Sequence, residues 1–93
     1  MLALVVENTF QKDIKKLKKA GTYNFKEFDK VLDCLLNKKS LPAKYKNHKL
    51  LGYYNGYYDC HIKDNWVLLY KIDTKHNQLI LARTGTHADV LGM

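Results

Sequence analysis

Residues 53–72, with the sequence YYNGYYDCHIKDNWVLLYKI, decide the fold of this chain. The run places Asn55-Gly56 between pairs of tyrosines, and Asn-Gly flanked by β-prone residues is a strong signal for a hairpin with a type I′ turn. A second β-prone run, Trp66 to Ile72, follows a polar break, and a third, Gln78 to Thr84, follows a turn at 73–77. We therefore predict that the C-terminal half is a β-sheet built from successive hairpins.

The N-terminal part has the spacing of helices. Ala3–Glu7 is predicted to be a short strand, after which Asn8 or Thr9 caps a helix that ends at Gly21. A second helix is predicted from Asn24 to Asn37. Each helix has apolar residues on one face at intervals of three, four or seven, namely Phe10, Ile14 and Leu17 in the first and Phe25, Phe28, Val31, Leu32, Leu35 and Leu36 in the second.

These elements predict one domain over residues 1–93 with the order β-α-α-β-β-β-β. The fold class is α+β, with the two N-terminal helices packed on one face of an antiparallel β-sheet. The more apolar face of the predicted sheet, which carries Tyr53, Tyr58, Cys60, Ile62, Trp66, Leu68, Tyr70, Ile72, Ile80 and Ala82, is assigned to the helices.

Charge points to the kind of partner. Sixteen basic residues against nine acidic ones give a formal charge of +7, and fifteen of the basic residues are lysines, so that Arg83 is the only arginine. Such a surplus in a small domain indicates a polyanion, either nucleic acid or an acidic protein. A merely solubilising lysine surface is the alternative. The acid-free segment from Lys38 to Lys49 is the predicted phosphate-contacting strip, and Lys44, Lys46 and Lys49 are its candidate RNA contacts.

Several classes of protein are disfavoured. No apolar run approaches the roughly 20 residues of a membrane span, and the first residues lack the features of an export signal, so we expect a cytoplasmic protein that does not bind membranes. Cys34 and Cys60 are then expected to be reduced thiols, and they do not form a C-x-x-C pair. We expect no metal site and no cofactor.

Strand pairing predicts where the polar side chains gather. If Tyr54 lies opposite Tyr57, Leu50 lies opposite His61 and His48 opposite Lys63. If Ile62 lies opposite Trp66 and Ile72 opposite Gln78, one row across the sheet contains Leu50, His61, Val67 and Arg83. His48 lies diagonal to His61, and the residues after Gly85 lie at the same end. This face is predicted to stay open to a ligand.

The residues on this face suit the cleavage of RNA without a metal. That reaction needs a base for the 2′-hydroxyl, an acid for the departing 5′-oxygen, and positive charge beside the phosphate. Histidine and arginine provide these functions, and His48, His61, His87 and Arg83 are the candidates. Each has an ordinary alternative: His48 caps a loop, His61 is an exposed strand residue, and Arg83 pairs with Asp59 or Asp64. His76 lies in a predicted turn and is taken as a bystander.

The same residues carry a family resemblance. The runs LPAKYKNHKL (41–50), GYYDCHI (56–62), 66–72 and RTGTH (83–87) resemble the YafQ-type toxins of the RelE/ParE superfamily. The resemblance implies a fold like that of microbial ribonucleases, metal-independent cleavage of messenger RNA in the ribosomal A site, and silencing by an acidic antitoxin with which the toxin binds operator DNA. It also implies that His87 is the general acid–base, that Arg83 contacts the phosphate, and that His48 and His61 supply a second proton-transfer group and positioning.

The sequence departs from the family pattern at two positions. The family's aspartate before the tryptophan is Asn65 here, so either the preceding Asp64 replaces it or the role is one of positioning. Asp64 is therefore a further catalytic candidate, and Asn65 and Trp66 are predicted RNA contacts. A family aromatic near the C-terminus is Leu91 here, which changes the surface available for stacking on a base.

Two other functions remain open from the sequence. One is a non-catalytic module that binds RNA or the ribosome through the basic surface. The other is a ParE-like inhibitor of DNA gyrase, which would not need proton-transfer groups. With an acidic antitoxin as the partner, association is expected to slow as salt is added.

Overall fold

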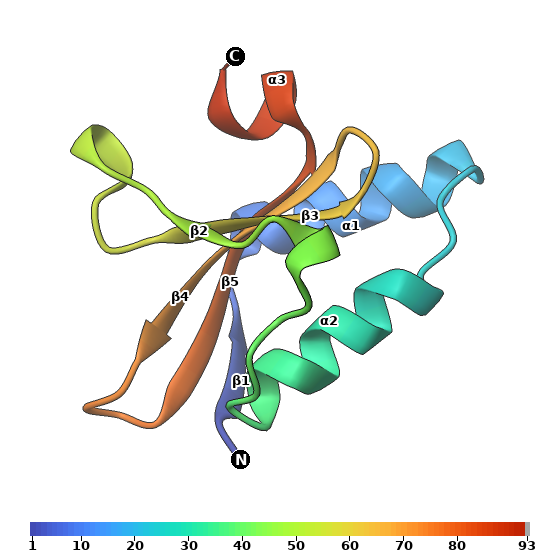
Figure 1. Ribbon diagram of the computed structural model, residues 1–93. Coiled ribbons are helices and arrows are strands. Elements are labelled where there is room, and N and C mark those ends of the chain that lie inside the picture. The colour runs from blue at the N-terminus through green and yellow to red at the C-terminus, as the bar shows by residue number, and fades with distance from the viewer. Residues whose placement is uncertain (93) are drawn as a thin grey trace.

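The computed structural model describes residues 1–92 (Figure 1). Its elements follow in the order β1 (Ala3–Val6), α1 (Asn8–Ala20), α2 (Lys26–Leu36), β2 (His48–Lys49), β3 (Tyr58–Lys63), β4 (Trp66–Asp73), β5 (Gln78–Thr86) and α3 (His87–Leu91), with short 3₁₀ turns at Ala43–Tyr45 and Gly52–Tyr54. The strands form one sheet in the order β1-β5-β4-β3-β2. The predicted α+β class, with two N-terminal helices on one face of a sheet, is confirmed. None of the described helices is long and apolar enough to cross a membrane.

The first strand changes the character of the sheet. β1 pairs with β5 in parallel, with Val5 opposite Ile80, whereas the other three pairings are antiparallel. The sheet is therefore mixed, and not wholly antiparallel as predicted. The hairpin signals concern chain neighbours only, and they leave open which edge the N-terminal strand joins and in which direction.

The boundaries of the helices differ from prediction at the N-terminal side. Neither Asn8 nor Thr9 caps α1: Glu7 is the N-cap residue and its side chain makes no capping hydrogen bond. The Thr9 hydroxyl instead donates to the carbonyl of Ala82 on β5, at 2.9 Å, and so ties the first turn of the helix to the sheet. Gly21 ends α1 as predicted, with a φ of 72° that suits glycine.

The core lies between the helices and one face of the sheet, and Trp66 is at its centre. Its indole ring stacks on Phe28 at 6.0 Å between ring centroids, is 5 % exposed, and donates its N–H to the hydroxyl of Thr84 at 2.8 Å. A ring held in this way is not available to a nucleotide. We therefore correct the prediction that Trp66 contacts RNA, since its bulk stabilises the core.

The hairpin that joins β2 to β3 turns at Asn55-Gly56 as predicted, but the turn is not of type I′. Asn55 has φ −54° and ψ 133° and Gly56 has φ 93°, with the Tyr57 N–H donating to the Tyr54 carbonyl, which is a type II turn. His48 lies opposite Asp59, and not opposite Lys63 as predicted. The register moves by four residues, and because side chains alternate with period two, His48 still shares a face with His61.

The predicted strand register is correct at His61 in the β3–β4 hairpin and wrong in the β4–β5 hairpin. His61 lies opposite Val67, as predicted. Arg83 lies opposite Leu69 and not Val67. One residue of this difference arises at the turn, where Ile72 lies opposite Leu79 and not Gln78, and the other at an irregularity between Leu69 and Tyr70. The difference at the turn corrects the face assigned to part of β5: Leu79 and Leu81 join the helix-covered core, in place of Ile80 and Ala82.

Candidate active site

Three of the four histidines surround one carboxylate on the sheet face that the helices α1 and α2 leave uncovered. The imidazoles of His61, on β3, and His87, at the start of α3, have centroids 4.9 Å apart in an edge-to-face arrangement. The Nε2 atoms of His48 and His87 lie 3.4 Å and 3.9 Å from Oδ2 of Asp59. His76 lies in the β4–β5 turn and contacts Asp73 at 2.7 Å. The predicted gathering of His48, His61, Arg83 and His87 is thus present for the three histidines, whereas Arg83 is directed to Asp13 of α1.

Asp59 is the member of this site that sequence reasoning missed. It is 0 % exposed, and neither carboxylate oxygen has a hydrogen-bond partner among residues 1–92. Burial raises the pKa of Asp59, against the opposing effect of His48, His61 and His87. The sequence places Asp59 on the histidine face, two residues before His61, but predicts it only as an alternative partner of Arg83 and not as a site residue.

The position of His87 depends on the first turn of α3. Thr86 is the N-cap residue, and its hydroxyl accepts the N–H of Asp89 at 3.2 Å. The backbone N–H of His87 donates to the Oδ1 atom of Asn65 at 3.2 Å. The side chain of Asn65 therefore holds the backbone that carries the imidazole. Asp64, its exposed neighbour, has a φ of 49° in the β3–β4 turn.

Arg83 is held by an ion pair that sequence reasoning also missed. Its Nε and Nη2 atoms donate to the carboxylate of Asp13 on α1, at 2.8 Å and 3.1 Å, and Asp13 also accepts the N–H of Thr84. The hydrogen bond to Asp13 raises the pKa of Arg83. The sequence alternatives of a pair with Asp59 or Asp64 are wrong. Asp13 is the only acidic residue of the lysine-rich α1, and this isolated carboxylate is the feature of the sequence that could have predicted the ion pair.

The predicted lysine strip borders the histidines. Lys44, Lys46, Lys63 and Asp64 line a shallow hollow of about 390 Å³ together with His61. Lys44 is 3.7 Å from Glu27, so part of its charge is neutralised, whereas Lys46 and Lys49 are exposed. The site thus combines imidazoles with accessible positive charge, as binding and cleaving a polyanion requires.

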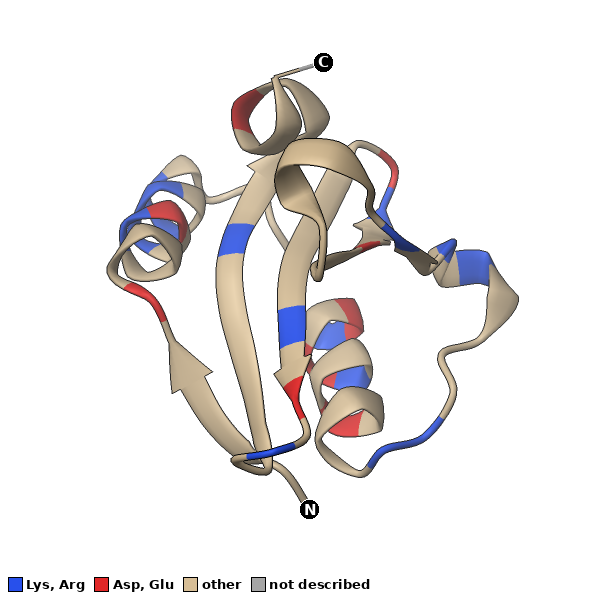
Figure 2. Ribbon diagram, turned by 90° about the vertical axis from the view of Figure 1, so that its left-hand side faces the viewer, with Lys and Arg blue, Asp and Glu red and all other residues tan. Residues whose placement is uncertain are grey.

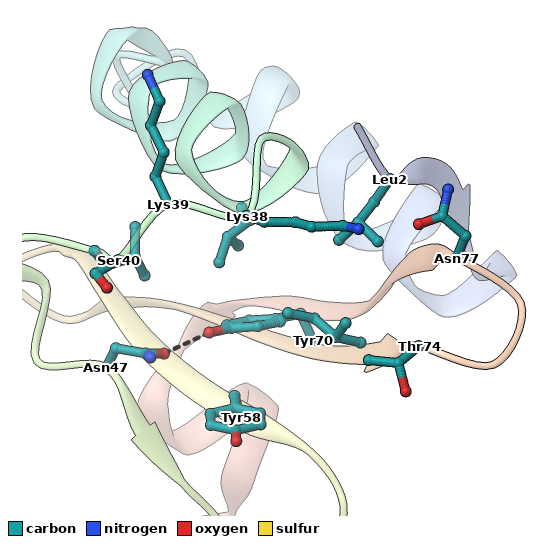
Figure 3. A pocket seen from close by; sticks show the side chains of 12 residues that line it. Leu2, Lys38, Lys39, Ser40, Asn47, Tyr58, Tyr70, Thr74 and Asn77 are labelled. Atoms are coloured by element: carbon teal, nitrogen blue, oxygen red, sulfur yellow. Dashed lines mark hydrogen bonds between the residues drawn. The ribbon is translucent and has the colours of Figure 1, made fainter.

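A larger hollow, of about 500 Å³, lies on the helix-covered side and contains none of the histidines. Figure 3 shows its lysines, Lys38 and Lys39, above a floor formed by Tyr58 and Tyr70. The hydroxyl of Tyr70 donates to Asn47 at 2.5 Å. Proton-transfer chemistry requires the imidazoles, so the candidate active site is on the opposite face of the sheet.

Three groups of the candidate site also have the spacing of metal ligands. One ligand atom from each of Asp59, His61 and His87 lies within 4.8 Å of the other two. Two imidazoles and a carboxylate are donors that several transition metals accept. The same atoms that can move protons are thus able to hold a cation.

Comparisons with known proteins agree with this fold. Residues 2–92 match the sequence model of the family described as "Bacterial toxin of type II toxin-antitoxin system, YafQ". The mRNA interferase toxin YafQ of Escherichia coli K12 is 38% identical over 84 residues, which cover 89% of this chain and 88% of the relative.

Solved structures extend the similarity to three dimensions. A YafQ crystal structure from E. coli BL21(DE3) shows 31% identity with a TM-score of 0.89, covering 99% of this chain and 100% of the other. The E. coli DinJ-YafQ complex gives 32% and 0.84 over 99% and 100%, and a metal-bound toxin from Helicobacter pylori gives 34% and 0.89 over 97% and 99%. This chain belongs to the YafQ family of toxins of bacterial type II toxin–antitoxin systems.

Proposed function

We propose that this toxin is a metal-independent endoribonuclease that cleaves messenger RNA at the ribosome. The observation that carries the proposal is the group of three imidazoles around the buried carboxylate of Asp59. Its E. coli relative is named an mRNA interferase, which supports RNA as the substrate. Proton-transfer groups favour an enzyme over a non-catalytic RNA-binding module or a gyrase inhibitor, because neither of these needs them.

The cleavage step uses two proton transfers. A histidine takes the proton of the 2′-hydroxyl as its oxygen attacks the phosphorus, and a second histidine gives a proton to the 5′-oxygen as the P–O bond breaks. The pair His61 and His87 lies close enough to serve the two ends of one phosphodiester. We assign the donated proton to His87 and the accepted one to His61.

His48 and Asp59 act as a proton reserve behind this pair. The Nδ1 atom of His48 lies 2.9 Å from the carbonyl of Lys46, which fixes the N–H at that position. The Nε2 atom then faces Oδ2 of Asp59 at 3.4 Å, and Nε2 of His87 faces the same oxygen at 3.9 Å. We propose that Asp59 passes a proton between these two imidazoles when they approach it during the reaction.

Positive charge stabilises the phosphate. Arg83 carries five N–H donors and Asp13 takes two of them, so the others can reach a phosphate oxygen. We propose that Lys44, Lys46 and Lys49 hold the RNA backbone. Asn65 acts by positioning His87, and Asp64, beside the hollow that contains His61, supplies the carboxylate that the family has one residue later.

The partners follow from the family. The E. coli relative is seen in a complex with DinJ, and we propose a corresponding acidic antitoxin here, with operator DNA bound only by the complex. The proposed location is the cytoplasm, where the ribosomal substrate is found.

The test compares histidine variants in two assays. Brief expression followed by primer extension on messenger RNA should reveal discrete cuts for the wild type. His87→Ala and His61→Ala should reduce cutting by about 10²- to 10⁴-fold, while His76→Ala, a histidine outside the site, should leave it unchanged. Intact transcripts with the wild type, or full toxicity of His87→Ala, would contradict a nuclease.

Metal independence needs a separate experiment. Metal-stripped toxin should cut a short single-stranded RNA equally well with EDTA and without it, since the proposed groups are all side chains. Cleavage that stops in EDTA and returns with an added divalent cation would assign the triad of Asp59, His61 and His87 to a metal instead.

A further inference from the structure

The loop between β2 and β3 carries an aromatic ring that packing does not explain. Figure 1 shows this loop, residues 50–57, extending beyond the sheet on the left. Tyr53 is 93 % exposed, and Leu51 in the same loop is 81 % exposed. A ring that is almost wholly exposed buries little apolar area, and it therefore adds little to the stability of the fold.

The loop is nevertheless fixed at its base, on the face of the sheet that carries the histidines. The residues of the loop that pack on that face, and the buried residues beneath them, are Leu50, Tyr54 and Tyr57 on Val67, Leu69, Ala82 and Val90. The hydroxyl of Tyr54 donates to the carbonyl of Val90, on α3, at 3.5 Å. The ring of Tyr53 lies edge-on to that of Tyr54, with centroids 5.0 Å apart. A packed neighbour thus limits the movement of the exposed ring.

Positive charge surrounds this ring. From Lys38 to Tyr58 the sequence contains five lysines and no acidic residue. Figure 2 looks onto the side from which the loop projects and shows no aspartate or glutamate on it. The ammonium group of Lys71, on β4, lies 5.7 Å from the centroid of the Tyr57 ring at the base of the loop. A ring bordered by lysines suits a polyanion.

The acidic residues of the neighbouring elements are buried or paired. Asp59 of β3 is 0 % exposed. Asp73, at the end of β4, lies 2.7 Å from His76, and Asp89 of α3 lies 3.5 Å from Lys16. A second copy of the chain would bring a further formal charge of +7 to the loop and be repelled.

We infer that Tyr53 is a stacking platform for an unpaired base of the messenger RNA, outside the nucleotides that contact the histidines. Aromatic rings beside lysines bind single-stranded nucleic acid, because every base has a face that can stack and the phosphates attract ammonium groups. The hairpin connects the ring to the site, since β2 begins with His48 and β3 carries His61. The bound RNA extends from the imidazoles along the hairpin to its tip. The inference rests on RNA as the substrate of the proposed function.

Fluorescence of 2-aminopurine tests the stacking directly. The probe is a short single-stranded RNA with the sequence of a mapped cut and a 2′-deoxynucleotide at the cleavage position, so that it is bound but not cut. The fluorescent base is placed at each other position in turn, and stacking on tyrosine quenches it. The wild-type toxin should quench one position away from the deoxynucleotide. Tyr53→Ala should abolish this quenching and weaken RNA binding by about 5- to 150-fold, as expected for the loss of one stacked base.

Two further variants separate the ring from the loop. Tyr53→Phe keeps the aromatic ring and should retain both the quenching and the affinity. Leu51→Ala shortens the other highly exposed side chain of the loop without removing a ring, and it should also retain both. Quenching that persists in Tyr53→Ala, or that is lost equally in Leu51→Ala, would overturn the inference.

The remaining outcomes distinguish this inference from the proposed nuclease. If the RNA is bound but no position is quenched, the platform is excluded and the histidine chemistry is unaffected. If RNA with its 2′-hydroxyl is bound and quenched but is never cut, with or without ribosomes, the nuclease proposal fails and the platform stands. If Tyr53→Ala impairs only co-sedimentation with ribosomes, or if the wild type binds no free RNA, the inference is wrong.

Discussion

The carboxyl group of Asp59 lies beneath three imidazoles without a hydrogen bond to either oxygen. A buried carboxylate without partners costs stability, and burial accordingly raises its pKa. If only stability mattered, an apolar residue would be expected at this position. The proposed function explains the carboxylate, because a carboxylate close to the imidazoles of His48, His61 and His87 can accept and return a proton.

Replacing Asp59 with asparagine should stabilise the protein at neutral pH and impair cleavage. The raised pKa means that the folded chain binds a proton more tightly than the unfolded one. The stability of the wild type therefore falls as pH rises from about 4, the ordinary value, through the raised value. Asp59→Asn lacks that loss, so its Tm relative to wild type should rise between pH 4 and pH 7.

The matched control is Asp73→Asn, at a carboxyl whose pKa is lowered by its hydrogen bonds to His76. The stability that Asp73 contributes is present above its ordinary pKa and lost as pH falls through the lowered value. This variant should therefore have a lower Tm than wild type by a nearly constant amount between pH 4 and pH 7, and the difference should shrink only below about pH 4. Equal and parallel Tm curves for Asp59→Asn and the wild type would show that Asp59 is not held in an unfavourable site.

Among the elements, α3 has the least intrinsic stability and the most direct effect on the site. It has five residues, too few to be stable alone, and it begins with His87. Its first turn is held by two side chains, those of Thr86 and Asn65. The position of His87, the proposed acid–base group, thus depends on two hydrogen bonds.

Removing the cap of α3 should lower both stability and activity. Thr86→Ala deletes the hydroxyl that accepts the Asp89 N–H, which should cost about 1 kcal/mol in urea unfolding and reduce RNA cleavage. Thr86→Ser keeps the hydroxyl and should retain both. A Thr86→Ala protein that cuts RNA at the wild-type rate would show that α3 is held by its packing alone.

At the scale of the whole molecule, the +7 charge should make RNA binding strongly salt-dependent. For single strands, the slope of log affinity against log salt changes by about 0.7 for each phosphate neutralised. The double variant Lys46→Gln/Lys49→Gln should therefore reduce the slope by about 1.4. Lys75→Gln, in the β4–β5 turn, should leave it unchanged. Equal slopes for both variants, measured by fluorescence anisotropy on a short RNA, would place the RNA elsewhere.

The sequence by itself determined the class of fold and the face of the sheet that carries His48 and His61. Local signals suffice for these properties because helix and strand periodicity, glycine positions and the parity of alternating side chains depend only on chain neighbours. The register error at His48 was four residues, an even number, so this histidine stayed on the predicted face. Near the β4–β5 turn the error was one residue, and the faces of Ile80 and Leu81 were therefore assigned wrongly.

Only the tertiary structure decided the parallel placement of β1, the burial of Trp66, the pairing of Arg83 with Asp13, and the enclosure of Asp59. Each of these joins segments far apart in the chain, and the choice depends on packing that no local pattern encodes. A tryptophan can stack on a nucleotide base or pack in a core. A carboxylate can be solvated by water or lie buried beside imidazoles. The surrounding elements select between these environments.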